Sequence, residues 1–505
     1  MKFLNHLTLL FAFTTTFGQQ STKPVVEFKH EMVPEPVLTN DKEFVDFYYK
    51  AWEIAFSQIK TDKGVPQSPY VDEAFDPNVI WIWDTNFMLH FWKYAQTSFP
   101  ESILTLNNFY KPILDKAPLS LSIEILDNPP LFSWTENAFY KLSNNKQHLE
   151  DVLVKNQYPQ RYFEYFDTVP KGTKAYGSAT TWIKKVPNGY LWEGGRSGMD
   201  NTPRGRIGAH ATKQRPNNPD MLWVDAISQQ ALNALYIKKM YEKVGDKTSA
   251  IVWNKKYEDL KSTINLKYWN EKDQFYYDLD QNTLQPMKVK SIASYWPLLA
   301  EVASNDQAKL MVDKIKTDSL FGGQVPLTTL ARNDSDFKEN GEYWRGGVWL
   351  PTAYMTIKGL EKYGYYDVAY DTSYKIISHM LKTYNQYEPH TIWESYSPTK
   401  PEPAANELKG ISRPNFCGWS ALGPISLLIE DVIGFYDIDA AQNTIKWNLS
   451  RKDIHGIKNL KFGTTLTDII YTGNNNITVK STAPYLLFVN GKKLKVKTGD
   501  NNFKL

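Results

Sequence analysis

The stretch Asp41–Phe56, DKEFVDFYYKAWEIAF, repeats apolar residues at intervals of three and four and predicts an amphipathic helix. The pair Asn40-Asp41 resembles an N-cap. Similar stretches follow, for about a dozen in all, near Trp83–Thr97, Ser102–Lys116, Pro130–Lys141, Gln147–Phe166, Val224–Val244, Ser249–Trp269, Ile292–Ala303, Asn305–Thr317, Val348–Tyr363, Tyr366–Tyr384 and Trp419–Ile433. Most of these stretches come as consecutive pairs joined by loops, so the pattern predicts a mainly α protein built from helical hairpins.

Paired helices over residues 41–441, with few long strands among them, are typical of a closed toroid of helical hairpins. A helical solenoid is the alternative arrangement. Solenoids show a repeat of fixed period, and the sequence shows none, which favours the toroid.

The pattern changes to short β-rich runs from about Gln442. They are Thr467–Thr472, Asn476–Lys480 and Tyr485–Val489, and the last is followed by the hairpin signal Asn490-Gly491. We therefore expect a small all-β domain over residues 442–505, packed against the helical body rather than binding sugar independently.

The N-terminus has the order of a secretory signal: Met1-Lys2, an apolar run from Phe3 to Phe17, then Gly18-Gln19. We expect a signal peptide over residues 1–19 and a polar leader over 20–40. The apolar run is too short to span a membrane. Cys417 is the only cysteine, so no intrachain disulfide forms. Export without disulfides favours a bacterial periplasmic or secreted protein.

Composition excludes several other classes. The net charge is +3 with the charges interspersed, which gives no indication of nucleic-acid binding. The sequence contains no His/Cys zinc pattern and no glycine-rich phosphate loop. Aromatic residues make up 14% of the chain, and such rings stack on sugars as readily as they fill cores.

Two acidic segments combine aromatic, turn-forming and hydrogen-bonding residues: WEGGRSGMDNTPR over Trp192–Arg204, and TIWESYSP over Thr391–Pro398. Cleavage of a glycosidic bond requires one carboxyl that donates a proton and one that activates water. Asp200 lies in a Gly- and Pro-containing loop where desolvation would keep its proton available, although an Asx-turn is the alternative interpretation. Glu394 is a candidate base, or a structural acceptor for a neighbouring Tyr or Arg.

The segment Gly198–Arg204, GMDNTPR, resembles the general-acid motif of glycoside hydrolase family 63 and is related to the equivalent loop of family 37 trehalases. Four more segments resemble family motifs in the same order over residues 81–434: Trp81–Thr85, Tyr343–Trp349, Trp393–Pro398 and Phe416–Gly423. The resemblance implies an (α/α)6 barrel, inversion at the anomeric carbon, Asp200 as acid and Glu394 as base. Inversion requires the two carboxyl groups to lie about 6.5–9.5 Å apart.

The resemblance also implies a set of sugar-binding residues. Asp84, Arg204, Trp344 and Arg345 would hold the cleaved sugar, since a guanidinium fork can donate to two hydroxyls or keep a carboxylate ionised. Trp83, Trp134, Trp192 and Trp419 are candidate stacking platforms, and each is equally compatible with a place in the core. Arg196 stands where relatives often carry Glu, and Ser395 and Ser397 replace familiar Asn residues. The substrate specificity of the family therefore cannot be carried over to this chain. The reversed charge at Arg196 suggests an anionic or otherwise unusual substrate.

These observations predict an exported, inverting, α-glucosidase-like hydrolase of oligosaccharides that needs no cofactor. Relatives sometimes hold calcium, but no compact Asp-rich loop here supplies its ligands. The alternatives are a trehalase-like or rhamnosidase-like hydrolase on the same barrel, or a noncatalytic carbohydrate-binding protein. Epimerases and lyases rely on His or Tyr, and the eight His residues lie mostly outside the Trp-rich loops. The sequence sets neither oligomeric state nor exo versus endo action.

Overall fold

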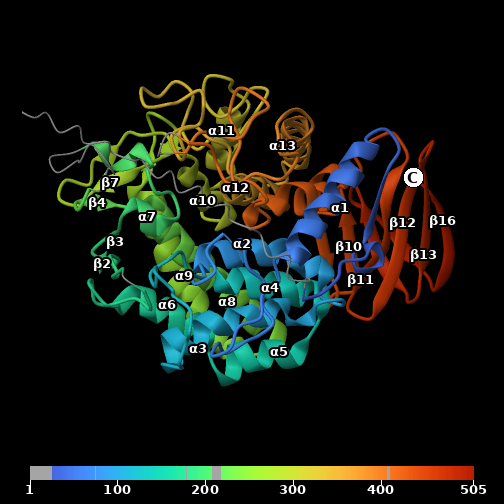
Figure 1. Cartoon of the computed structure of the whole chain (residues 1–505), viewed down its shortest axis with the longest axis horizontal. Coiled ribbons are helices and arrows are strands. Elements are labelled where there is room, and N and C mark those ends of the chain that lie inside the picture. Colours follow the sequence, from blue (N-terminus) through green and yellow to red (C-terminus); the bar gives the residue numbers. More distant parts are fainter. Residues whose placement is uncertain (1–24, 74, 178, 208–217, 407–409) are drawn as a thin grey trace, which may run out of the picture.

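The computed structural model describes residues 25–505 except 74, 178, 208–217 and 407–409. It combines a helical body with a β-domain at one side (Figure 1). The expected signal peptide lies outside the described residues. None of the described helices is both long enough and apolar enough to span a membrane.

The α-helices agree with most of the predicted periods. They are α1 (Lys42–Ser57), α2 (Ile82–Trp92), α3 (Asn107–Asp115), α4 (Phe132–Ser143), α5 (Lys146–Glu150), α6 (Tyr158–Thr168), α7 (Gly194–Ser197), α8 (Val224–Val244), α9 (Lys247–Lys267), α10 (Trp296–Leu299), α11 (Asn305–Ile315), α12 (Leu350–Lys362) and α13 (Tyr366–Gln386). The 3₁₀ segments are η1 (His30–Met32), η2 (Lys93–Ala95), η3 (Pro100–Leu106), η5 (Pro203–Arg206), η6 (Ile292–Tyr295) and η7 (Trp419–Leu422), and the π-helices are η4 (Asp151–Lys155) and η8 (Gly423–Ile433).

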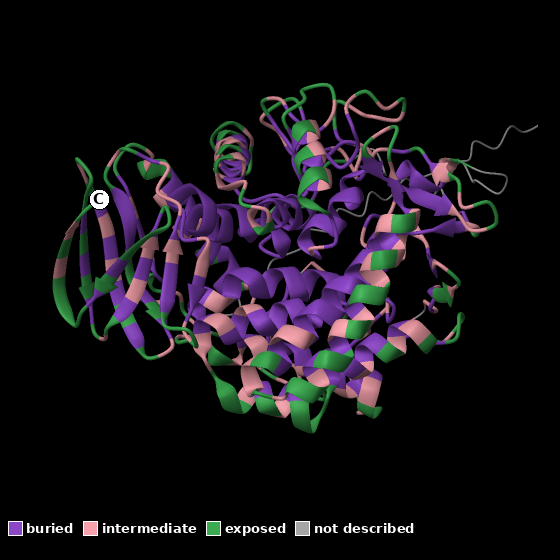
Figure 2. Cartoon of the chain, turned by 180° about the vertical axis from the view of Figure 1, so that it is seen from behind, coloured by how far each residue is buried: buried purple, intermediate pink, exposed green. Residues whose placement is uncertain are grey.

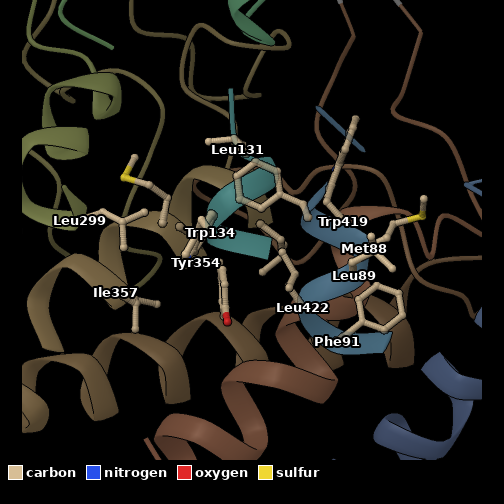
Figure 3. Close-up of a cluster of buried hydrophobic side chains, with 14 of the residues drawn as sticks. Met88, Leu89, Phe91, Leu131, Trp134, Leu299, Tyr354, Ile357, Trp419 and Leu422 are labelled. Atoms are coloured by element: carbon tan, nitrogen blue, oxygen red, sulfur yellow. The ribbon is translucent and has the colours of Figure 1, made fainter. Parts of the chain in front are cut away.

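Six helical segments, here called the central helices, contact one another in a closed circuit. The contacts run from α2 to α4, α8, α10, α12 and the continuous η7–η8 segment, which contacts α2 again. The remaining long helices pack outside this circuit, with α9 against α8 and α13 against α12 and η8. The ribbons of the circuit are almost wholly buried, whereas α9 carries exposed residues (Figure 2). Apolar side chains from every central helix form the core, among them Leu89, Leu299, Ile357 and Leu422 (Figure 3).

One predicted helix, Gln147–Phe166, is broken in the structure. The chain leaves η4 at Asn156, takes a left-handed conformation at Gln157 (φ 51°), and starts again as α6 with Pro159 in its first turn. Proline fits the first turn of a helix but disrupts an interior. The break therefore has a local cause that the apolar period did not register.

Sixteen strands are assigned within the described residues. Short strands β2 (Lys184–Val186), β3 (Gly189–Leu191), β4 (Met221–Leu222), β7 (Asp278–Asp280) and β8 (Pro286–Met287) form one sheet in the order β2-β3-β4-β7-β8, and β5 (Trp269–Asn270) pairs with β6 (Phe275–Tyr276). The β-domain contains β1 (Glu35–Leu38), β9 (Asp437–Asp439), β10 (Thr444–Trp447), β11 (His455–Phe462), β12 (Thr465–Gly473), β13 (Asn476–Ser481), β14 (Tyr485–Val489), β15 (Lys492–Val496) and β16 (Gly499–Lys504).

Two sheets make up the β-domain, in the orders β1-β11-β12-β13-β16 and β15-β14-β10-β9. The rings of Phe462 and Tyr485 lie 5.3 Å apart and join the two sheets. The predicted hairpin is present: Val489 pairs with Lys492 across Asn490-Gly491, and both turn residues have positive φ, as a type I′ turn requires.

The first strand of this domain comes from the expected leader. Residues of β1 pair antiparallel with β11, from Glu35 opposite Lys458 to Leu38 opposite His455. The polar, Pro-containing composition of the segment predicts a leader, and a four-residue edge strand leaves little signal in such a segment. The β-domain thus includes residues from both ends of the described chain.

Trp447 joins the β-domain to the helical body. Its indole is fully buried, donates a 2.7 Å hydrogen bond to the carbonyl of Ile433, and packs on Phe435 and His455 at ring distances of 4.7 and 5.5 Å. The end of η8 and the second sheet are therefore held by one side chain.

Trp447→Ala should lower the free energy of unfolding by about 3–5 kcal/mol, because it empties this contact and leaves a buried carbonyl without its donor. Urea denaturation measures the change. Trp182→Ala is the control, since Trp182 is only partly buried, and it should cost far less. An equal loss in both variants would contradict a special role for Trp447.

Candidate active site

Glu394 lies in the segment between α13 and η7, and both its backbone N–H and its carbonyl are hydrogen-bonded. Its N–H donates to the carbonyl of Arg413 at 2.9 Å. Its carbonyl accepts hydrogen bonds from the Trp419 indole N–H at 2.8 Å and the Ser420 hydroxyl at 3.1 Å. The carboxylate therefore leaves a rigid backbone that is tied to the start of a central helix.

The side chain of Glu394 is 2% exposed and is paired with Arg413. The guanidinium of Arg413 donates to Oε1, and the backbone N–H of Arg413 donates to Oε2 at 3.2 Å. Burial raises the pKa of Glu394, while Arg413 acts in the opposite direction. Because a carboxylate has about four acceptor positions, this carboxyl retains capacity to bind a water.

Asp84 lies in the first turn of α2, close enough for the charge of Glu394 to act on it. Burial is the main cause that raises the pKa of Asp84 well above its usual range, the charge of Glu394 raises it further, and Arg413 lowers it. The structure thus brings together two of the predicted site residues, Asp84 and Glu394, with Arg413 as their shared cation.

The segment that carries Asp200 is a short helix followed by a tight turn, rather than a continuous loop. Helix α7 ends at Ser197 and is capped by Gly198, whose φ of 83° is left-handed. A Cβ at Gly198 would lie 2.7 Å from the Trp83 indole, and one at Gly194 would lie 2.7 Å from the carbonyl oxygen of Asp200. Only glycine permits these approaches. Asp200 is half-buried.

A series of contacts connects the Asp200 segment to Glu394. The side chain of Asn201 accepts a 2.8 Å hydrogen bond from the backbone N–H of Trp344 and donates to the carbonyl of Glu342 at 3.1 Å. Trp344 stacks on Trp349 at 4.1 Å and 15°. Trp349 in turn contacts Trp419, 5.6 Å away, which binds the backbone of Glu394.

Trp83, whose indole lies against Gly198, is also connected to the Asp200 segment through Asn128. Its backbone N–H donates to Asn128 at 3.3 Å, and Asn128 donates to the carbonyl of Arg196 at 3.0 Å. The charge of Arg196 is paired with Glu193 at 2.9 Å. The unusual cation near Asp200 is therefore neutralised locally, which removes the reason to infer an anionic substrate from it.

Arg204, predicted to hold the sugar, is fully buried in a different role. Its guanidinium donates to Asp225 at 2.7 and 2.9 Å and to Asp278 at 2.8 Å, and it lies over the Trp223 ring at 4.6 Å. With no exposed atom and two carboxylates on its donors, Arg204 stabilises the segment after Asp200 rather than offering hydrogen bonds to a ligand.

Three other predicted sugar contacts are placed differently from expectation. Trp192 is 1% exposed and packs edge-on against Phe166 and Trp223, as a core aromatic. Trp134 lies in the first turn of α4, where it packs against Phe87, His90 and Tyr354 as a buried aromatic. Arg345 is ion-paired with Glu342 at 2.9 Å and Asp336 at 2.7 Å.

Sequence reasoning missed several residues on which the site depends. Arg413, Asn128 and Asn201 make its central contacts, and Asp225 and Asp278 hold Arg204. Their partners lie between 19 and 143 residues away in the chain, as with Arg413 to Glu394 and Asn201 to Trp344. Only Asn201 had a signal, its place beside Asp200 in the quoted motif. Among the described residues no cluster of His, Cys, Asp and Glu is suited to hold a metal ion.

Residues 128–413, more than half of the chain, match the protein-family model of the mannosylglycerate hydrolase MGH1-like glycoside hydrolase domain. The chain belongs to this glycoside hydrolase family. The matched range includes Asp200, Glu394 and Arg413, and the predicted resemblance to family 63 is confirmed. The enzyme class, a glycoside hydrolase, follows from the family.

Two relatives are similar to the chain over very different lengths. A Borreliella burgdorferi protein of uncharacterised function is 28% identical over 479 residues, covering 91% of this chain and 94% of its own. The cytosolic neutral trehalase of Kluyveromyces lactis is 28% identical over 150 residues, 29% of this glycoside hydrolase and 20% of the trehalase.

Solved structures show the same fold at low identity. A sialidase covers 93% of this chain and 41% of its own with a TM-score of 0.69 and 15% identity. The family 63 mannosylglycerate hydrolase of Thermus thermophilus, solved with Tris and D-glycerate, covers 75% of this chain and 99% of its own with a TM-score of 0.55 and 14% identity.

Arg204→Met should destabilise this hydrolase by about 3–5 kcal/mol, because Asp225 and Asp278 would remain buried without a cation. Urea unfolding measures the loss. Arg206→Met is the matched control: Arg206 also pairs with two carboxylates, those of Asp334 and Asp336, but its side chain is 25% exposed. A smaller loss for Arg204→Met than for Arg206→Met would contradict the structural role of Arg204.

Proposed function

We propose that this protein is an exported, inverting glycoside hydrolase that cleaves α-linked glycosides from oligosaccharides, with Asp200 as general acid and Glu394 as general base. The observation that carries the proposal is the setting of Glu394, a buried carboxylate on a fixed backbone with a cation beside it. The closed circuit of central helices supports an (α/α)6 barrel as the scaffold. Export follows from the N-terminal apolar run of the sequence, and its check is the N-terminal residue of the mature protein.

The base must be ionised when the sugar is bound. Burial alone would favour a protonated Glu394, and the Arg413 guanidinium opposes this effect because it stabilises the carboxylate form. With Oε1 and Oε2 each engaged by Arg413, the remaining acceptor positions would orient an attacking water.

The acid is Asp200, on the turn that follows α7. Gly198 and Gly194 allow this turn to pack against Trp83 and against its own backbone, which fixes the direction from which the carboxyl approaches a ligand. The side chain of Asn201 connects this turn to Trp344 by a hydrogen bond. The indoles of Trp344, Trp349 and Trp419 continue the contact to Glu394. We assign Trp83, Asp84 and Trp419 to the cleaved sugar, because Trp83 lies against Gly198, Asp84 lies within reach of the charge of Glu394, and Trp419 binds the Glu394 backbone. Trp344 is 1% exposed, so its predicted sugar contact is replaced by a positioning role within the stacked indoles.

A trehalase-like activity is the main alternative substrate preference, and the aligned segment of the Kluyveromyces lactis trehalase motivates it. Trehalose therefore belongs in the substrate panel, together with α-glucosides, α-mannosides, aryl rhamnosides and mannosylglycerate. The noncatalytic alternative predicts sugar binding with no turnover for any substrate in the panel.

Asp200→Asn should reduce kcat by about 10²–10⁴-fold, because general-acid catalysis contributes that much. Asp306→Asn, an exposed carboxylate in the first turn of α11, is the control and should retain full activity. Early proton NMR spectra of the wild-type reaction should show the β-anomer first from an α-linked substrate. Full activity in Asp200→Asn would exclude it as the acid, and an α-anomer first would exclude inversion.

Arg413→Gln should move the acidic limb of the kcat/KM profile upwards by about 1 pH unit, because the pKa of Glu394 rises when the neighbouring cation is removed. The base works as the carboxylate, so its activity is lost as the pH falls through that pKa. Arg413→Lys retains the charge and should shift the limb less. An unchanged limb in Arg413→Gln would show that Glu394 is not the group titrating there.

A further inference from the structure

A cavity of about 780 Å³ lies at the end of the central helices that is remote from Glu394. Site residues such as Asp84 and Trp419 occupy the starts of central helices, whereas most of the cavity lining comes from later turns, for example His90 of α2, Lys358 of α12 and Glu430 of η8. Trp134, in the first turn of α4, also lines the cavity. Residues from 435–446, a range that includes β9 and the start of β10, complete its wall. The cavity is thus separate from the proposed catalytic centre.

Aromatic rings from three central helices form the floor of this cavity. The ring of Trp134 lies 3.9 Å from His90 and 6.0 Å from Tyr354, and the planes of Trp134 and Tyr354 differ by 32°. Figure 3 shows Trp134 and Tyr354 side by side within the buried cluster. The sequence leaves Trp134 as either a stacking platform or a core aromatic, and in the structure it lines this second space.

The wall consists of ion pairs rather than of unpaired charges. Lys93 binds Glu430 at 2.7 Å, and Lys358 binds Glu430 at 2.8 Å and Glu361 at 2.6 Å. Lys239 and Glu301, which are more exposed than these residues, pair at 2.6 Å. Further pairs join Lys141 and Lys446 to Asp437, Lys243 to Asp439, and Lys362 to Glu301. All seven lysines of the lining already have a carboxylate partner.

Two polar atoms of the floor and wall have no hydrogen-bond partner among the described residues. They are Nε2 of His90 and Oδ1 of Asn137. Both side chains line the cavity, and both residues are more than nine-tenths buried. Both atoms have almost no accessible surface, so a ligand hydroxyl meets them once the side chain turns towards the cavity. A buried polar group without a partner costs about 1–3 kcal/mol, and the new hydrogen bond would recover that cost.

We propose that this cavity is a second, noncatalytic binding site for a neutral polyhydroxylated molecule of disaccharide size. Its volume lies within the 300–1,000 Å³ range of small-molecule sites. Hydroxyl groups donate to carboxylates and accept from ammonium groups at once, and ions that are already paired retain capacity for both. An anion would instead have to displace a carboxylate from a lysine. The site is independent of the proposed catalytic residues.

The test is hydrogen–deuterium exchange of the full chain, in the Asp200→Asn background so that sugars are not cleaved. Maltose and trehalose are the neutral probes, and inorganic phosphate is the anionic probe. Either disaccharide, at ten times its Kd, should slow amide exchange about tenfold in residues 134–142 and 435–446. This holds for amides that exchange through a local opening which the bound ligand prevents.

Ala138→Trp fills the cavity from α4 and should abolish this protection, whereas Ala117→Trp makes the same change at a half-buried alanine outside the lining and should preserve it. Asn137→Leu, which retains side-chain volume but removes the polar atoms, should weaken binding about tenfold and serves if Ala138→Trp does not fold. Protection confined to residues 81–84 and 393–413, protection by phosphate alone, or no protection at all would overturn the proposal.

Discussion

The buried cluster of Arg204, Asp225 and Asp278 is the interaction on which the site's geometry depends. It joins three segments: the 3₁₀ turn just after Asp200, the first turn of α8, and strand β7. Two carboxylates and one guanidinium without solvent are expensive to bury, and each is tolerable only because the others satisfy it. The arrangement admits one register of the Asp200 segment on the central helices.

From this fixed point the site extends by neutral contacts. Asn201 uses both ends of its amide on the Glu342–Trp344 segment, and the indoles of Trp344, Trp349 and Trp419 continue the contact to the backbone of Glu394. Rigid aromatic and amide contacts carry little charge, so they position two carboxyl groups without perturbing either. The electrostatic control at Glu394 is left to Arg413.

Much of the fold could be predicted from local sequence. Apolar periods found the long helices, and Asn490-Gly491 found its hairpin, because those signals act within one element. The π-helical form of η8 and the break before α6 could not be obtained from the same period. At the site, the family motifs indicated Asp84, Asp200 and Glu394, but the motif alone could not separate Arg204, which is buried on two aspartates, from a residue that faces a ligand. Long-range partners decide that difference.

The pairing of β1 with β11 has a consequence for how the chain folds. Strand β1 is synthesised early, and its partner β11 follows more than four hundred residues later in the chain. Contacts of such sequence separation close slowly, because the intervening loop must first become ordered. The last sheet can therefore close only after the helical body has been synthesised, and until then a bare strand edge remains available to neighbouring molecules.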